Sequence, residues 1–221
     1  MLYCLHLFFP PRERSERGLS HYLKLTIMQE TAPFLNQVFN SKSFKREDLE
    51  TIFKQYKRVE FRKNDYFIQQ GNVAGYYYFM ESGFARSYAI DLEGNDITTK
   101  FFSPMDIVID WYSYFLKKPC REDIQAITPC VAWKIHFEDF MKLFHIEAFR
   151  EVGRTRLVNN FFELKNHSVS VIVDPAKDRY LQLVKDKPDL LQNVPLKQIA
   201  TYLGITDTSL SRIRKEIAEK K

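Results

Sequence analysis

The spacing of apolar residues changes twice along the 221-residue chain. From residue 28 to about 56 they recur at steps of three and four, with a polar interruption at 40–43, which predicts two short helices. Between residues 57 and 135, short runs rich in Tyr, Phe, Ile and Val alternate with glycines and prolines, which predicts an antiparallel roll or barrel of about eight strands. From Phe137 onward the spacing is helical again.

A hairpin is expected near the centre of the strand region. The polar segment 92–96 separates two strand-like runs, 86–90 and 97–102. Gly94 can supply the positive φ that a tight turn between such strands requires.

The longest predicted helix, 148–173, carries more apolar surface than one face needs. Its apolar positions are Val152, Leu157, Val158, Phe161, Phe162 and Leu164. Either the helix only covers the roll, or one stripe packs on the roll while another pairs with the same helix of a second chain, as in a coiled coil. We favour the second alternative and expect a homodimer.

Another helix is expected to follow at once. Asp174 and Pro175 have the order of a cap followed by a first-turn proline. Its buried face is expected to be Tyr180, Leu181 and Val184.

The segment 194–215 predicts a helix, a tight turn and a second helix. Pro195 begins the first helix, Gly204 ends it, and Thr206 can cap the second. The spacing i, i+3 and i+7 defines the core side of the second helix, with Leu210, Ile213 and Ile217. At 100° per residue the opposite side carries Thr208, Ser211, Arg212 and Lys215.

This outward face is short, polar and basic, as a helix entering the DNA major groove requires. Arg can bond bidentately to guanine, and Thr or Ser can contact base edges or phosphate. A helical hairpin with a solvated basic face is the ordinary alternative. The inner aliphatic positions, Ala200, Gly204 and the Thr206 cap at their mutual spacing favour double-stranded DNA as the partner.

Composition adds little to this interpretation. The formal charge of +5 suits an anionic partner without proving one. Cys4, Cys120 and Cys130 lack CxxC spacing and predict free thiols in a reducing compartment, hence the cytoplasm. No apolar run approaches the roughly 20 residues that span a bilayer, so no membrane partner is expected. Residues 1–27 lack periodicity, and we expect them to be dispensable, either as a disordered extension or as upstream sequence read from an earlier start codon.

Two sets of motifs resemble the Crp-Fnr superfamily of bacterial transcription regulators. In the roll they are 63–71 and the strand-glycine-strand segment 78–86, and in the tail 199–200, 203–206 and the run through Arg212 and Ile213. The resemblance, over about 34–217, implies an α+β fold: a cyclic-nucleotide-binding-like antiparallel β-roll with flanking helices (28–147), a long dimer helix (148–173) and a winged-helix-like helix-turn-helix domain (174–221). Because the chain ends soon after Lys215, we expect the wing to be missing or vestigial.

The resemblance assigns roles to residues of the second helix. Arg212 falls where the family has a base-reading arginine, while Thr206 and Ser209 fall at phosphate-contacting positions. Asp207 and Thr208 stand where the best-known members carry Arg and Glu, so the operator is expected to differ from theirs. The predicted DNA-binding set is Lys197, Thr206, Asp207, Thr208, Ser209, Ser211, Arg212 and Lys215. RNA polymerase is the further partner that the resemblance implies.

The effector pocket is expected to depart from the cyclic-AMP-binding members. Their Gly-Glu pair and Arg-Ser-Ala run correspond here to Ile109-Asp110 and Cys120-Arg121-Glu122. Ile109 puts a branched side chain where backbone must approach phosphate, and Glu122 adds a negative charge near an anionic ligand. Arg121 is shifted by one place, which on a strand turns it to the other face. We therefore expect no binding of cyclic AMP and no cofactor, with some other small-molecule effector left open.

Aromatic residues beside this segment leave two alternatives. Phe101, Phe102, Trp111, Tyr112, Tyr114 and Phe115 could line an effector pocket or fill the core of the roll. We favour the core for most of them.

Two other classes of protein are weighed against a DNA-binding regulator. A metal-dependent enzyme on a cupin-like roll needs clustered ligands on the strands, and all five histidines are expected outside them. A nucleotide- or ligand-sensing module acting through a protein partner would have no use for Thr208 and Arg212 on an exposed helix face. We therefore predict a regulator without enzymatic activity.

Overall fold

The computed structural model describes residues 33–39 and 43–219. The chain forms two compact units, Met1–Lys54 and Gln55–Lys221, which are described separately. The expectation for residues 1–27 lies outside the described part of the chain.

Two short helices form the described part of the first unit, as the sequence predicted. They are α2 (Pro33–Val38) and α3 (Arg46–Gln55). The apolar residues that α3 contributes, Leu49, Ile52 and Phe53, are buried. The ring of Phe39 lies 6.3 Å from that of Phe53 and completes this small core.

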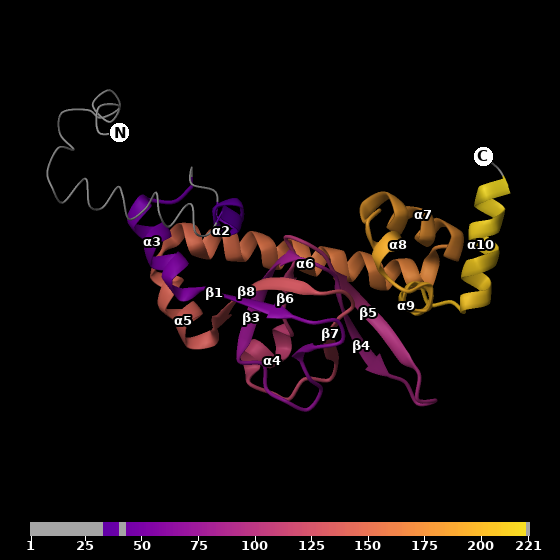
Figure 1. The fold of residues 1–221 in the computed structure, drawn as a ribbon, viewed down its shortest axis with the longest axis horizontal. Coiled ribbons are helices and arrows are strands. Elements are labelled where there is room, and N and C mark those ends of the chain that lie inside the picture. The colour runs from indigo at the N-terminus through magenta and orange to yellow at the C-terminus, as the bar shows by residue number, and fades with distance from the viewer. Residues whose placement is uncertain (1–32, 40–42, 220–221) are drawn as a thin grey trace, which may run out of the picture. The chain divides into compact units, whose positions relative to one another are not determined.

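Strands of the second unit form two four-stranded antiparallel sheets (Figure 1), which confirms the predicted roll. One sheet has the order β1-β8-β3-β6 and the other β2-β7-β4-β5. The strands are β1 (Lys57–Phe61), β2 (Tyr66–Ile68), β3 (Tyr76–Ser82), β4 (Ala85–Ile90), β5 (Asp96–Phe102), β6 (Ile107–Val108), β7 (Asp123–Ala126) and β8 (Cys130–His136).

The hairpin expected around Gly94 joins β4 to β5. Ile90 pairs with Asp96 across it, and Gly94 has the positive φ of 86° that the turn requires. The Asp91 carboxylate accepts hydrogen bonds from the amides of Glu93 and Asn95, which holds the turn closed.

Helices flank the roll and continue to the C-terminus. They are α4 (Trp111–Leu116), α5 (Phe137–Lys142), the 3₁₀ helix η3 (Leu143–His145), α6 (Glu147–Val173), α7 (Ala176–Asp186), α8 (Leu190–Asn193), α9 (Leu196–Tyr202) and α10 (Asp207–Glu219). The helix expected at 148–173 is α6. No strand occurs among the described residues after β8.

Two expectations about α7 were wrong. Asp174 ends α6 in an extended conformation, and Pro175 precedes α7 without a side-chain cap. On α7 itself, Tyr180 is buried and Val184 is partly buried, as predicted, but Leu181 is 42% exposed and Leu183 is buried in its place. This difference arises because the packing partners of α7 come from distant parts of the chain.

The placement of His136 corrects the expectation that every histidine lies outside the strands. His136 is the last residue of β8, and its ring lies 5.0 Å from that of Tyr76. Over the described residues, no three His, Cys, Asp or Glu side chains are grouped as a metal ion would need. Likewise, none of the described helices is both long and apolar enough to span a bilayer.

Candidate nucleic-acid interface and effector pocket

A short turn joins α9 to α10 and is built as the sequence predicted. Gly204 adopts a φ of 66°, and its amide donates to the Thr201 carbonyl at 3.0 Å. Thr206 caps α10, because its Oγ1 accepts a hydrogen bond from the Ser209 amide at 3.2 Å.

The inner sides of α9 and α10 meet in a buried apolar core. Ile199 and Ala200 of α9 are fully buried, and Leu210 of α10 is 1% exposed. Ile213 and Ile217 pack against the same core and are partly buried. The predicted core side of α10 is thus confirmed. This packing fixes which side of the helix faces the core.

The outer side of α10 faces solvent. Thr208, Ser211, Arg212 and Lys215 are all exposed, and Lys215 makes only a loose ion pair of 3.8 Å with Glu219. Of the other predicted DNA-contact residues, Lys197, Thr206 and Asp207 are exposed, whereas Ser209 is half-buried. The hydroxyl of Ser209 accepts from Thr206 Oγ1 at 3.0 Å. The predicted set therefore lies on α9, the turn and α10.

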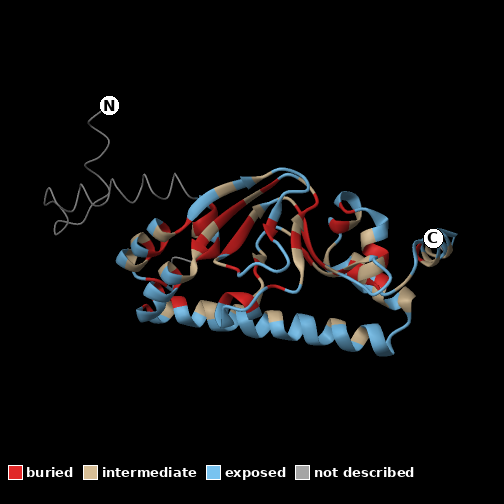
Figure 2. Cartoon of the chain, turned by 90° about the horizontal axis from the view of Figure 1, so that it is seen from below, coloured by how far each residue is buried: buried red, intermediate tan, exposed pale blue. Residues whose placement is uncertain are grey.

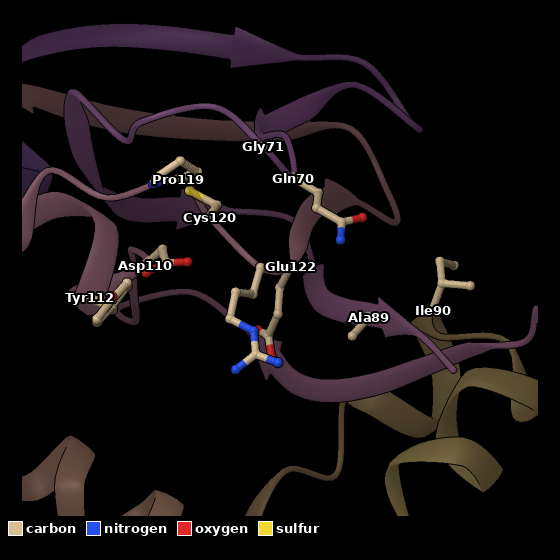
Figure 3. Close-up of a pocket in the computed structure, with 10 residues that line it drawn as sticks. Gln70, Gly71, Ala89, Ile90, Asp110, Tyr112, Pro119, Cys120 and Glu122 are labelled. Carbon is tan, nitrogen blue, oxygen red and sulfur yellow. The ribbon is translucent and has the colours of Figure 1, made fainter. Parts of the chain in front are cut away.

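A cavity of about 820 Å³ opens beside α4 (Figure 3). Its lining residues are Gln70, Gly71, Ala89, Ile90, Asp110, Tyr112, Pro119, Cys120, Arg121 and Glu122. Four of the five predicted effector-pocket residues are among them. The exception is Ile109, which is buried and does not line the cavity.

The carboxylates of the cavity are anchored by the surrounding protein. Glu122 Oε2 accepts hydrogen bonds from Ser87 Oγ and, at 3.1 Å, from Thr99 Oγ1. Asp110 accepts from the Ser113 amide at 2.8 Å and so caps α4. Burial raises the pKa of the Cys120 thiol. Glu122 therefore presents to the cavity a carboxylate that two hydroxyl groups hold in place.

The expectation for Arg121 was wrong in its structural premise. The segment before β7 is a loop, so the alternation of a strand does not apply to Arg121. Its side chain is exposed and lines the cavity.

The neighbouring aromatics divide between core and surface. Phe101, Phe102 and Tyr114 are buried, as favoured from the sequence. Tyr112 is 52% exposed and is the one aromatic of the predicted six that lines the cavity, and Phe115 is also exposed. Trp111 Nε1 donates to Asn160 Oδ1 of α6 at 3.2 Å.

Comparisons with known proteins agree with this architecture. Residues 58–147 match the family model described as the cyclic nucleotide-binding domain. Among solved structures, FixK2 of Bradyrhizobium japonicum is 16% identical with a TM-score of 0.64, over 75% of this chain and 85% of FixK2. The chain has the fold of the Crp-Fnr regulators. The resemblance inferred from the sequence is thereby confirmed for the fold.

Two further structures match at the same identity. CLP of Xanthomonas campestris, a c-di-GMP responsive global regulator, has 16% identity and a TM-score of 0.61 over 80% of this chain and 93% of CLP. A CooA mutant from Carboxydothermus hydrogenoformans has 16% identity and a TM-score of 0.62 over 83% of this chain and 84% of CooA. Comparison with curated protein sequences gives no match.

Several residues of the cavity were not predicted from the sequence. Gln70 lines it, and Ser87 and Thr99 hold Glu122 in place. They come from three separate segments, so no spacing within one segment could have indicated them.

Proposed function

We propose that the protein is a cytoplasmic transcription regulator that binds operator DNA as a homodimer, with α10 as the recognition helix and without catalytic activity. The observation that carries the proposal is the exposed face of α10. Leu210 fixes the inner side in the core, and Arg212 and Lys215 lie on the opposite, solvent-facing side. The fold shared with FixK2 and CLP supports it.

The chemistry of this face suits the major groove. Arg212 can donate two parallel hydrogen bonds to guanine O6 and N7. Thr208 and Ser211 are short enough to let the helix approach the base edges. Lys215, near the end of the helix, and Lys197, at the start of α9, suit phosphate contacts. The capped N-terminus of α10 adds backbone N–H groups and a partial positive charge for a further phosphate.

Arg212→Ala is expected to leave folding nearly intact and to cost about 1–3 kcal/mol of specific binding, the usual worth of a bidentate base contact. The loss should appear mainly as a relaxed preference at one base pair. Titrations on the cognate site, on its single-base variants and on random DNA measure this directly.

Lys215→Ala is the matched contrast on the same helix face. As a phosphate contact it should weaken specific and random DNA alike and lower the slope of log K against log salt by about one unit. If Arg212→Ala weakened all these DNAs equally, or unfolded the C-terminal helices, the recognition face would be misassigned.

For the effector pocket we propose a ligand other than cyclic AMP. A cyclic phosphate in the cavity would lie beside the Glu122 carboxylate, which Ser87 and Thr99 hold in place. Arg121 also lines the cavity, but its side chain is exposed, so solvent screens its attraction for a phosphate more than it screens the repulsion from the partly buried Glu122 carboxylate. Calorimetry with purified protein is expected to detect no micromolar binding of cyclic AMP. Micromolar binding that also strengthened operator affinity would overturn this proposal.

A further inference from the structure

The helices after α6 pack on the second sheet of the roll through one apolar core (Figure 1). The roll contributes Phe84, Phe101 and Ile127. The C-terminal helices contribute Tyr180, Leu183, Leu190, Val194, Ile199, Ala200, Leu203 and Leu210. Because the core beneath α9 and α10 is continuous with the roll, the position of α10 depends on this packing.

Polar and aromatic contacts run along the same boundary. The amide of Thr98, on the edge strand β5, donates to Thr201 Oγ1 of α9 at 3.2 Å. The ring of Tyr202 lies 5.1 Å from Phe101 of β5 and stacks at 4.1 Å on His167 of α6. The roll, α6 and α9 therefore meet around Thr201 and Tyr202 of α9.

Four charged side chains form an ion-pair cluster at this junction: Lys100, Asp106, Glu163 and Lys187. Lys187 Nζ lies 3.1 Å from Glu163 Oε1 of α6 and 3.5 Å from Asp106 Oδ2, just before β6. Lys100 Nζ of β5 lies 3.4 Å from Glu163 Oε2. Burial lowers the pKa of Lys187, but the attraction of Asp106 and Glu163 outweighs it and raises that pKa overall.

We infer that Lys187 is a positioning residue, which holds the C-terminal helices, and α10 with them, in a fixed orientation to α6 and the roll. Within the ion-pair cluster, Lys187 is the one member that comes from the chain after α6. It contacts α6 through Glu163 and the roll through Asp106. Its side chain is only 24% exposed, so solvent screens the pairs less than it screens a surface pair. The inference rests on the proposed function, because it concerns how α10 is presented to DNA.

Orientation matters because the proposed dimer forms through α6. Two recognition helices then read two half-sites about 34–36 Å apart, one turn of DNA. A fixed angle between α6 and α10 allows one half-site spacing and penalises others. Lys187 therefore determines which distance between half-sites the dimer prefers. The base contacts that each α10 makes within its own half-site do not depend on it.

The test uses the full chain carrying Lys187→Met, with Lys185→Met as control, since Lys185 is an exposed lysine of α7 two residues away. Wild-type protein and Lys185→Met should prefer one half-site spacing over one lengthened by a few base pairs. In Lys187→Met that preference should fall about tenfold, while affinity for a single half-site changes less than about twofold. Lys187→Arg, which keeps the charge, should restore the preference.

Hydrogen exchange at the Thr98 amide gives a second readout that needs no DNA. That amide is protected by Thr201 only while the helices are docked, so Lys187→Met should raise its exchange rate about tenfold. If Lys187→Met fails to fold, Glu163→Gln removes the attraction at the same contact. The inference would be overturned if Lys187→Met showed the same half-site spacing preference and the same Thr98 protection as Lys185→Met. If the wild type binds no DNA, the proposed function fails, and Thr98 exchange still decides whether Lys187 holds the helices.

Discussion

Replacing Gly83 by alanine is expected to destabilise the roll by about 2–5 kcal/mol, from a left-handed backbone and an overpacked site together. Gly83 joins β3 to β4 with a φ of 90°. An added Cβ would lie 2.3 Å from the Pro129 carbonyl oxygen and 2.7 Å from Cys130 Sγ. Since Pro129 offers backbone and not the end of a flexible side chain, the strands themselves would have to move. Urea unfolding followed by circular dichroism measures the loss.

Gly94→Ala is the matched control for this position. Gly94 has nearly the same backbone, with a φ of 86°, but no heavy atom lies within 4 Å of its added Cβ. Only the conformational cost of about 1–2 kcal/mol is expected there. Equal losses in the two variants would mean that the close approach of Gly83 to β8 is not what requires glycine.

Replacing both Phe161 and Phe162 by glutamate is expected to convert a homodimer into monomers. These side chains are 61% and 55% exposed in the single chain and belong to an apolar stripe of α6. The side of α6 that faces away from the roll is exposed along most of its length (Figure 2). The stripe also contains Leu157, Val158, Val169 and Ile172. Burying one phenylalanine is worth about 1.5–3 kcal/mol, so losing two per protomer should raise the dissociation constant more than about 100-fold.

Sedimentation at micromolar concentration distinguishes the two states. Asn159→Glu with Asn166→Glu adds the same charge to the same exposed helix, at positions outside the apolar stripe, and should remain dimeric. A monomeric wild type, with or without DNA, would contradict dimerisation through α6. Equal dissociation of both double variants would show that added charge, and not the loss of the stripe, separates the protomers.

Local patterns were enough to predict the features that depend on near neighbours. The hairpin at Gly94, the Thr206 cap and the inner side of α10 each depend on spacing within a few residues, and all three are confirmed. The long helix α6 was predicted nearly to the residue, because its apolar positions repeat over many turns.

Features that depend on distant partners were not predictable in the same way. Leu183 is buried because α7 packs toward Leu190 and Phe101 in a shared core, which no periodicity within α7 reveals. Arg121 lies in a loop whose course is fixed by its pairing partners, including the hydrogen bond from the Gly71 amide to the Cys120 carbonyl. The ion-pair cluster around Lys187 joins residues from four separate segments of the chain, and no local pattern indicates it.

The most direct test of the central claim is selection of binding sites from a random DNA pool with the full-length wild-type protein. The account predicts enrichment of two related half-sites with two-fold symmetry, centred about 34–36 Å apart or a multiple of that distance. Affinity for the enriched sites should fall steeply with salt, since phosphate contacts release counterions. Absence of any enriched sequence, together with a shallow salt dependence, would contradict DNA recognition by α10. It would favour a sensing module that acts through a protein partner.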